Sequence, residues 1–319
     1  MLIEVSERKG KGSQPLVSVM IPAYRSGETL LCAIKSVLSQ DYSNVQLIVC
    51  DDGTEGFDQI KLEEFLRTQE RRLAFKVIHW PQNGGTVQNL NRSLPFAEGD
   101  WVMPLAADDA LANQETLTHL MEQVRASGRR WIISKTGMCD ENLERCGTIV
   151  PSEADIAYLN GAERSALYYR LCRDCFLPSS GAVYQRKVLD ESGGFDPRYK
   201  LVEDWPLFLK LVRNGLIPEV SAEVCVFHRG GGVSKKHAGG NQDYQRDLIA
   251  VMENEILPHL GLLDADCQKK VRSMVRDKKR IFQYRFQCGN VWKRLVWVIR
   301  NTDVIFRKIV GKLGMNDDF

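Results

Sequence analysis

Short apolar runs recur in the first third of the chain, and stretches with helical periodicity separate them. The runs cover residues 17–21, 45–50, 75–80 and 101–105. Apolar side chains recur at three- and four-residue spacing across 28–39, which predicts a helix with one apolar face. Further helices are predicted over 56–71, over 86–97 and around 117–124. Strands that alternate with helices predict an α/β fold with a mostly parallel sheet.

The second half of the chain has a weaker pattern. Residues 181–184 and 224–227 predict short strands, residues 204–214 predict a helix, and a glycine-rich loop follows at 229–234. From these patterns we expect three regions: an N-terminal tail (1–14), one α/β domain (15–240) and a helical, basic C-terminal region (241–319).

Polar side chains gather immediately after the predicted strands. The segments are Pro22–Tyr24, Asp51–Thr54, Asn83–Gly85 and Asp108–Asp109. Ligands of parallel α/β sheets bind beyond the carboxyl ends of the strands. These side chains are therefore the first candidates for a functional site.

Three pairs of adjacent carboxylates stand out, namely Asp51/Asp52, Asp108/Asp109 and Glu203/Asp204. A single such pair is more often a helix cap or an exposed turn. Three pairs directed to one edge repel one another unless a cation lies among them, and Mg²⁺ or Mn²⁺ prefers oxygen ligands. The chain lacks G-x-G-x-x-G after its first strand and lacks G-x-x-x-x-G-K-[ST], which disfavours dinucleotide binding and P-loop chemistry.

Several ordered motifs together resemble the family 2 glycosyltransferases with the GT-A fold. They are VSVMIPAYRSGETLLCAIKSVLSQDY, LIVCDDGT, NGGTVQNLNRS, the acidic pair after WVMPL, GAVYQRKVLDESGGFD and VEDWPLFLKLVRNG. The resemblance implies a GT-A, Rossmann-like sheet and an inverting transferase that uses a nucleotide-diphosphate sugar and a divalent metal, Mn²⁺ or Mg²⁺. It also implies that 15–112 bind the nucleotide and 113–240 bind the acceptor.

The resemblance assigns donor-binding roles residue by residue. Pro22, Ala23 and Tyr24 match the segment against the nucleotide base, where an aromatic ring can pack. Asp51 and Asp52 match the pair of which one accepts a hydrogen bond from a uracil-type base, and Asp51 is favoured. The remaining donor positions are Asn83, Gly84, Asn91 and Asp108.

The metal motif departs from the family pattern. Ala106 replaces the first Asp of Asp-x-Asp, which leaves Asp108 and its neighbour Asp109 as ligands. A histidine after the last strand, His228 or His237, could complete the site, although a lone histidine is more often structural. The alternative function that Ala106 suggests is a non-catalytic relative that binds nucleotide-sugars.

The pair Glu203/Asp204 matches the Glu-Asp pair of the family at the start of a helix. Asp204 is the expected general base, because inverting transfer needs a carboxylate that takes the proton of the attacking hydroxyl. The alternative is that Asp204 only caps the helix. Glu203 and Trp205 are expected to bind the acceptor.

Composition limits the class of protein and the cellular compartment that we expect. The 319 residues carry 43 Lys and Arg against 41 Asp and Glu, and 44% are hydrophobic, which excludes disordered and fibrous classes. No apolar stretch is long enough for a membrane span or placed as in a signal peptide. We therefore expect a cytoplasmic protein whose nine cysteines are mostly buried, reduced thiols.

The C-terminal region is strongly basic. Residues 269–314 hold 14 Lys and Arg and two Asp. From 291 to 313, six apolar residues including Trp292 fall on one helical stripe and basic residues fall largely on the other side, which is typical of a helix on an anionic membrane surface. A helix packed on the body is nearly as plausible, and nucleic-acid binding is disfavoured because the body is acidic. We expect peripheral association with the inner face of the plasma membrane, a saccharide acceptor that is lipid-linked, and a role in polysaccharide or O-antigen synthesis.

Overall fold

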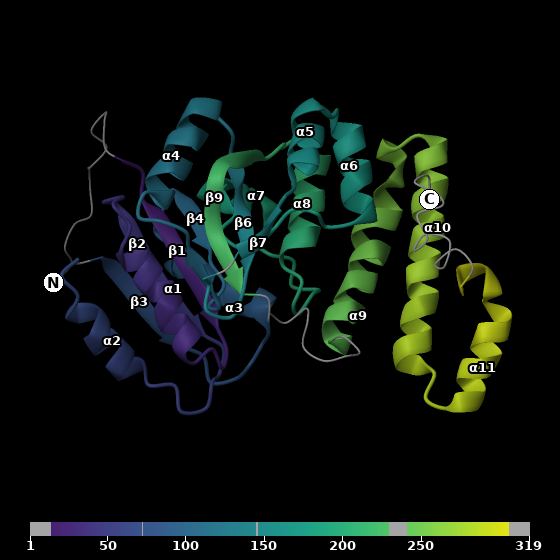
Figure 1. The fold of residues 1–319 in the computed structure, drawn as a ribbon, viewed down its shortest axis with the longest axis horizontal. Coiled ribbons are helices and arrows are strands. Elements are labelled where there is room, and N and C mark those ends of the chain that lie inside the picture. Colours follow the sequence, from purple (N-terminus) through teal and green to yellow (C-terminus); the bar gives the residue numbers. More distant parts are fainter. Residues whose placement is uncertain (1–13, 72, 145, 230–240, 306–319) are drawn as a thin grey trace.

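The structure is a computed structural model that describes residues 14–71, 73–144, 146–229 and 241–305 (Figure 1). Its first half alternates strands and helices, as the sequence predicts. The elements are β1 (Val17–Ala23), α1 (Glu28–Leu38), β2 (Val45–Asp51), α2 (Gln59–Arg67), β3 (Ala74–His79), α3 (Thr86–Ser93), a 3-10 turn (Leu94–Phe96) and β4 (Trp101–Pro104). All residues of β2 are buried. Burial on both faces explains why these strands appear as continuous apolar runs.

The second half contains more elements than the sequence predicts. They are β5 (Asp109–Leu111), α4 (Thr116–Ser127), β6 (Trp131–Cys139), β7 (Cys146–Val150), α5 (Glu153–Gly161), α6 (Arg164–Arg173), β8 (Val183–Gln185), α7 (Arg186–Ser192), α8 (Asp204–Arg213) and β9 (Glu219–Arg229). The predicted strands at 181–184 and 224–227 correspond to β8 and β9, and the helix at 204–214 to α8. Strand β6 is missed because Ser134, Lys135 and Thr136 interrupt its apolar run.

All nine strands of the described chain form one sheet in the order β3-β2-β1-β4-β8-β6-β9-β5, with β7 paired to β6. Strands β1, β2, β3, β4, β6 and β9 run in one direction, and β5, β7 and β8 run in the other. The expected mostly parallel GT-A sheet is confirmed. Its carboxyl edge brings together the ends of β1 and β2 and the chain after β4.

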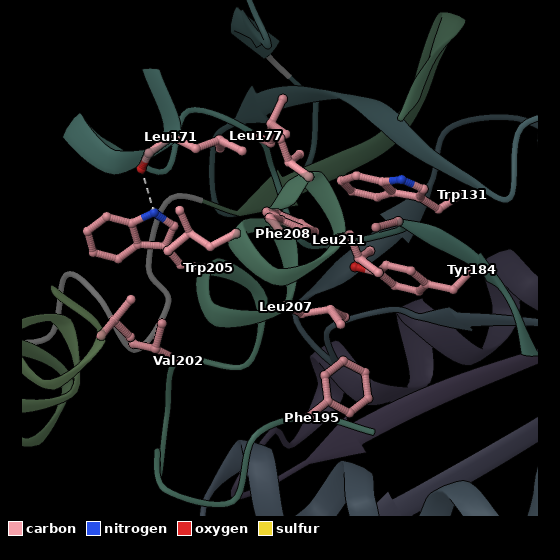
Figure 2. Packing of buried hydrophobic residues seen from close by; sticks show 14 of the residues in the cluster. Trp131, Leu171, Leu177, Tyr184, Phe195, Val202, Trp205, Leu207, Phe208 and Leu211 are labelled. Carbon is pink, nitrogen blue, oxygen red and sulfur yellow. Dashed lines mark hydrogen bonds between the residues drawn. The ribbon is translucent and has the colours of Figure 1, made fainter. Parts of the chain in front are cut away.

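Two hydrophobic cores lie on the two faces of this sheet. In β1, Val17, Val19 and Ile21 belong to one core with α1, α2 and α4, whereas Met20 belongs to the other with α3, α6 and α8. This division follows from the two-residue period of a strand. In the second core, the Trp131 ring stacks on Phe208 with centroids 5.3 Å apart (Figure 2).

The C-terminal helices continue the second core. They are α9 (Gln242–Val251), α10 (Ala265–Phe282) and α11 (Val291–Arg300), joined by short π and 3-10 segments. Val251, Val271 and Val275 are buried in the same cluster as α8, so the residues on both sides of position 240 share one core. None of the described helices has both the length and the apolar composition needed to cross a bilayer.

Helix α11 is shorter than the stripe over 291–313 predicts. Asn301 leaves the helical conformation (φ −131°, ψ 35°) and ends the helix. Residues 306–313 lie outside the described part of the chain, as do the glycine-rich loop, His237 and nearly all of the N-terminal tail.

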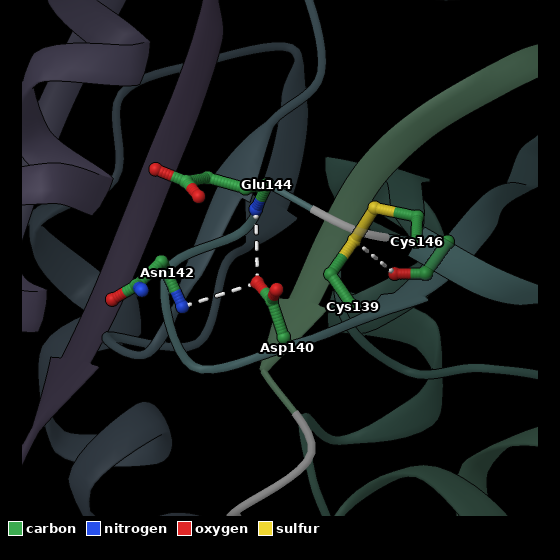
Figure 3. Close-up of a disulfide and its surroundings, with 6 residues drawn as sticks. Cys139, Asp140, Asn142, Glu144 and Cys146 are labelled. Carbon is green, nitrogen blue, oxygen red and sulfur yellow. Dashed lines mark hydrogen bonds between the residues drawn. A yellow bond between two sulfur atoms is a disulfide. The ribbon is translucent and has the colours of Figure 1, made fainter.

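The expectation of reduced thiols needs one correction. Cys139 and Cys146 form a disulfide that joins the ends of β6 and β7 (Figure 3). Within the loop between them, the carboxylate of Asp140 accepts hydrogen bonds from the backbone N–H groups of Asn142 and Glu144. The two cysteines are paired across the antiparallel ladder, a proximity that the spacing of two cysteines in sequence does not reveal. The other seven cysteines are free, and three of them are buried.

Candidate functional site

A cleft of about 540 Å³ lies at the carboxyl edge of the sheet. Most of the predicted donor residues line it: Pro22, Ala23, Tyr24, Asp52, Asn83 and Asp108. These residues come from the ends of β1 and β2, the loop before α3 and the turn after β4. The topology therefore brings together segments that are up to about 80 residues apart, as expected for a parallel sheet.

A second hollow of about 420 Å³ adjoins this cleft, because Ala23 and Ser26 line both. Asp51 and Thr54 lie in its wall together with apolar side chains of α1 and α2, including Leu30 and Leu62. A flat aromatic ring with polar edges suits a hollow of this kind, which is mostly apolar with a few polar groups.

Asp51 and Asp52 are buried and strongly hydrogen-bonded. Asp51 Oδ2 accepts a hydrogen bond from the N–H of Thr54 at 2.8 Å and lies 2.9 Å from His79 Nδ1. Asp52 accepts hydrogen bonds from the N–H groups of Gly84 at 2.9 Å and Gly85 at 2.8 Å, and it forms an ion pair with Arg92. Asp52 therefore ties the end of β2 to the start of α3.

Two of the expected donor positions face elsewhere. Gly84 and Asn91 line a different hollow on the outer side of α3. The Asn91 amide donates to the carbonyl oxygen of Phe195 at 2.6 Å and accepts from the Phe195 N–H at 2.9 Å. The structure thus gives Asn91 the role of a clamp between α3 and the loop before α8, which corrects its expected place in the donor site.

The predicted metal residues separate into two groups. Asp108 lines the cleft, and burial followed by the charge of Asp109 raises its pKa. Asp109 is 0% exposed, and its Oδ1 lies 2.8 Å from His228 Nδ1. Because a carboxylate only accepts, Nδ1 of His228 carries the proton in this pair. Asp109 therefore acts on His228 rather than in the cleft.

The surroundings of Asp108 test whether a divalent ion fits. Among the described residues, no three His, Cys, Asp or Glu side chains come together as a metal site. Mg²⁺ and similar ions are often held by one or two carboxylates together with substrate phosphates. Asp108 is the carboxylate of the predicted metal motif that lines the cleft, which fits an ion that arrives with a diphosphate and does not fit a metal cage made of protein alone.

Arg229, at the end of β9, fixes the backbone at Asp108. Its Nη1 donates to the carbonyl oxygen of Asp108 at 2.7 Å, and its Nε donates to the carbonyl oxygen of Glu141 at 2.8 Å. Glu141 lies in the loop that the Cys139–Cys146 disulfide closes. The disulfide-closed loop and the turn at Asp108 are therefore held by one guanidinium group.

Glu203 and Asp204 form a desolvated pair of carboxyl groups at the start of α8. Burial, and then the charge of Asp204, raise the pKa of Glu203 to about 8, and burial raises the pKa of Asp204. Asp204 Oδ1 accepts a hydrogen bond from the N–H of Trp205 at 2.7 Å, whereas Oδ2 lies 3.8 Å from the Cys175 thiol. Glu203, and not Asp204, occupies the N-cap position, and it makes no side-chain cap. The alternative that Asp204 is an N-cap is therefore wrong.

Trp205 is a core residue, contrary to the expected place in an acceptor wall. It is 2% exposed, and its indole N–H donates to the carbonyl oxygen of Leu171 at 2.8 Å (Figure 2). The position after Asp204 faces inward because α8 begins there and packs this side against α6. In the sequence, a tryptophan next to a pair of acidic residues could lie either in the core or in the wall of an acceptor site, and the pattern does not separate the two.

Asp247 of α9 holds the loop that leads to Glu203. Its Oδ2 accepts hydrogen bonds from the N–H groups of Lys200 at 2.8 Å, Leu201 at 2.6 Å and Val202 at 3.3 Å. Gly85 lets this loop approach α3, because a Cβ there would lie 2.5 Å from the carbonyl oxygen of Lys200. The C-terminal region thus contributes to the position of the carboxylate pair.

Sequence reasoning missed further residues of the cleft. Lys200 and Asp243 line it and form an ion pair of 3.5 Å. Asn89 is buried in the cleft wall, donates to the carbonyl oxygen of Cys50 at 2.7 Å and leaves its own Oδ1 without a described partner. Asn89 could have been noticed as a polar residue on the apolar face of α3, next to Val87 and Leu90. The sequence gives no signal for Lys200.

Known proteins resemble this chain in sequence. The chain is 30% identical over 201 residues to the putative colanic acid biosynthesis glycosyl transferase WcaA of Escherichia coli, covering 63% of this chain and 67% of that one. It is 26% identical to the glycosyltransferase GlyG of Streptococcus pneumoniae, of which the match covers 41%. A shorter match, 32% identical over 94 residues, covers 30% of this chain and 35% of WfgD of E. coli, a UDP-Glc:α-D-GlcNAc-diphosphoundecaprenol β-1,3-glucosyltransferase.

Solved structures share the fold. TarS 1-349 of S. aureus in complex with UDP-GlcNAc has a TM-score of 0.59 at 20% identity, covering 91% of this chain and 80% of that one. The mannosyltransferase PcManGT of Pyrobaculum calidifontis, in complex with GDP-Man and Mn²⁺, has a TM-score of 0.57 at 15% identity, covering 96% of this chain and 82% of that one. The family model of glycosyl transferase family 2 matches residues 18–193, which include nearly all of β1, strands β2 to β4 and most of the residues that line the cleft. The ordered motifs, the GT-A sheet and this match together show that the chain belongs to glycosyl transferase family 2.

Proposed function

We propose that the protein is an inverting glycosyltransferase that moves a sugar from a nucleotide-diphosphate sugar to an acceptor hydroxyl. The observation that carries the proposal is the desolvated Glu203/Asp204 pair, which closely follows Lys200 and Leu201 of the cleft wall in the chain. A raised pKa on a carboxyl group near a cleft is typical of general acid–base residues. UDP is the favoured nucleotide.

The two adjoining hollows suit the two parts of such a donor. The base would lie in the smaller hollow, near Ala23, with Asp51 at its polar edge. Tyr24 lines the adjoining cleft. The diphosphate and sugar would lie in the larger cleft, where Arg25 and Lys200 can offset phosphate charge. TarS with UDP-GlcNAc supports a uridine nucleotide, whereas PcManGT with GDP-Man keeps guanosine as the competing choice.

Asp204 is the proposed general base. As the acceptor oxygen attacks the anomeric carbon, its proton passes to Oδ2 of Asp204, the carboxylate oxygen that lies 3.8 Å from the Cys175 thiol. The bond between the anomeric carbon and the diphosphate oxygen breaks on the opposite face, and the nucleoside diphosphate leaves with the bonding electrons. Glu203 keeps its proton up to about pH 8, so it can donate a hydrogen bond to the acceptor.

Asp108 would hold a divalent ion, Mn²⁺ or Mg²⁺, together with the donor diphosphate. When bound, such an ion neutralises the charge of the leaving diphosphate. Asp109 would act one step away, because its bond to Nδ1 of His228 fixes the orientation of that imidazole. Ala106 leaves this metal motif with one cleft carboxylate fewer than the family pattern.

The acceptor we propose is a lipid-linked saccharide in the synthesis of a polysaccharide, at the cytoplasmic face of the membrane. The names of WcaA and WfgD support this choice, since one refers to colanic acid biosynthesis and the other to a diphosphoundecaprenol acceptor.

A donor panel tests the proposal. The purified protein is incubated with UDP-, GDP- and dTDP-sugars plus Mn²⁺ or Mg²⁺, with and without a bacterial lipid extract, and nucleotide release is measured. We expect release from one donor, stimulation by lipid, and loss of release in Asp204→Asn. Nucleotide binding without release from any donor in the presence of lipid would favour the non-catalytic alternative.

A further inference from the structure

Helix α11 exposes an unusual amount of apolar surface. Trp292 is 76% exposed, Leu295 49%, Val296 42% and Ile299 66%. These are four of the ten exposed large hydrophobic residues of the described chain, and they lie within one helix of ten residues. Apolar side chains scattered singly over a surface are ordinary, whereas a cluster marks an interaction site.

The four side chains form one stripe. They follow the spacing i, i+3, i+4 and i+7, which places them within an arc of roughly 100° on a helix. The other side of α11 faces the protein: the Trp297 ring lies 4.8 Å from that of Tyr284, and Arg294 donates to the carbonyl oxygen of Cys288 at 3.2 Å. The stripe therefore points away from the body, at the outer edge of the molecule beside α10 (Figure 1). A helix whose apolar face packed on the enzyme would have the reverse orientation.

The charges beside the stripe indicate what covers it. Helix α11 carries Lys293, Arg294 and Arg300 and no acidic residue. An anionic bilayer surface offers an apolar layer to the stripe and negative headgroups to the cations. A second copy in a symmetric contact would place these cations opposite one another. A nucleic acid would satisfy the charges and leave the stripe in water.

We propose that α11 docks the protein on an anionic membrane, with Trp292, Leu295, Val296 and Ile299 inserted at the level of the headgroups. The inference rests on the proposed function in one respect: docking would serve to bring the cleft to a lipid-linked acceptor. The docking itself rests on the stripe, its orientation and its charges.

Vesicle co-sedimentation of the full chain tests the docking. Vesicles of phosphatidylcholine with phosphatidylglycerol are compared with vesicles of phosphatidylcholine alone. We expect binding to the mixed vesicles only, weakened by added salt because the surface potential is screened. The double variant Leu295→Glu/Ile299→Glu should lose at least about 10-fold in partitioning, because it replaces two inserted apolar side chains with anionic ones.

Two controls make the result specific. Ile60→Glu introduces the same change on α2, where Ile60 is 70% exposed, and should bind vesicles as the wild type does. Quenching of tryptophan fluorescence by brominated lipid should fall in Trp292→Phe. Failure of the wild type to bind the mixed vesicles, or equal binding by the double variant, would overturn the proposal. So would a change of oligomeric state in the double variant without lipid binding by the wild type, which would make the stripe a contact between copies.

Nucleotide binding and release in solution separate this inference from the proposed function. The stripe variants should bind nucleotide and release it from the donor without lipid as the wild type does. Vesicle binding by a chain that turns over no donor would support the docking and contradict the transferase. Donor turnover without vesicle binding would support the transferase and contradict the docking.

Discussion

The pairs Asp51/Asp52 and Glu203/Asp204 are both adjacent carboxyl groups near the end of an apolar segment, yet their environments differ. Asp52 accepts two backbone N–H bonds and pairs with Arg92, and Asp51 accepts a backbone N–H bond and faces His79. Glu203 and Asp204 have no cationic partner among the described salt bridges, and burial raises the pKa of both. The first pair is held by hydrogen-bond donors and a cation, whereas burial raises the pKa of the second pair.

This difference indicates a division of labour. Carboxylates that are held by backbone N–H groups, as Asp52 is, keep two segments of the chain in register. Carboxyl groups whose charged form is destabilised hold or release protons near neutral pH, which is what a catalytic base requires. Adjacent acidic residues in a sequence are therefore ambiguous until the donors around each of them are known.

The variant that tests the difference between the two carboxylate pairs most sharply is Asp204→Asn. The amide cannot take the proton of the attacking hydroxyl, so turnover should fall by about 10²- to 10⁴-fold. Nucleotide release under saturating donor measures the effect. Asp190→Asn, a change at an exposed acid of α7, is the matched control and should leave turnover unaltered. Turnover in Asp204→Asn within a few-fold of the control would refute the assignment.

The largest effect on stability is expected for Asp52→Ala. The change leaves Arg92 and two backbone N–H groups without their partner, and loss of one member of a buried ion pair costs about 3–5 kcal/mol. Urea denaturation measures the free energy of unfolding. Asp52→Asn, which keeps one acceptor oxygen, should lose less. A loss below about 0.5 kcal/mol in Asp52→Ala, the size expected of an ordinary surface change, would contradict the structural role.

Asp247→Ala probes the link between the C-terminal region and the carboxylate pair. Three backbone N–H groups lose their shared acceptor, so we expect a loss of about 1–3 kcal/mol in the free energy of unfolding. Turnover should fall while nucleotide affinity changes little, because the loop of 200–202 leads directly to Glu203. Asp247→Asn retains an acceptor and should restore turnover; equal loss in both variants would point to a purely structural role.

A further predicted effect is a pH dependence of the stability, which comes from Glu203. Its folded-state pKa of about 8 lies above the ordinary value of 4.5, so the folded chain keeps a proton that the unfolded chain has released. The stability contributed by this proton is complete below the ordinary pKa and is lost as the pH rises to about 8. Glu203→Gln should therefore have the Tm of the wild type at low pH and a rising advantage toward pH 8. The control is Glu163→Gln, a change at an exposed residue. The same pH trend in this variant would contradict the assignment of the pH dependence to Glu203.

Much of the fold could be predicted from the sequence, because the first half follows simple rules. Strand β2 is apolar at every position from Leu47 to Cys50, and α1 has apolar residues at helical spacing between flanking turns. Strand β6 could not be recognised in the same way, since its central polar residues are buried by β9 and β7 rather than by its own pattern. Long-range pairing of this kind leaves no local signal.

The candidate site also has one part that the sequence predicts and another part that it does not. The ends of β1, β2 and β4 were predictable, because topology alone brings them to one edge. The direction of Trp205, the clamp formed by Asn91 and the pairing of Asp109 with His228 depend on which neighbours fold against them. Lys200 enters the cleft only because Asp247, from α9, holds its loop.

The most direct test of the division between the two carboxylate pairs measures nucleotide affinity and turnover in parallel, on the donor that the panel selects, for Asp204→Asn and Asp52→Asn. The account predicts that Asp204→Asn binds the nucleoside diphosphate as the wild type does and loses turnover, whereas Asp52→Asn loses affinity and stability and keeps the turnover of its bound fraction. Equal loss of affinity and turnover in Asp204→Asn, or turnover that survives in it, would contradict the account.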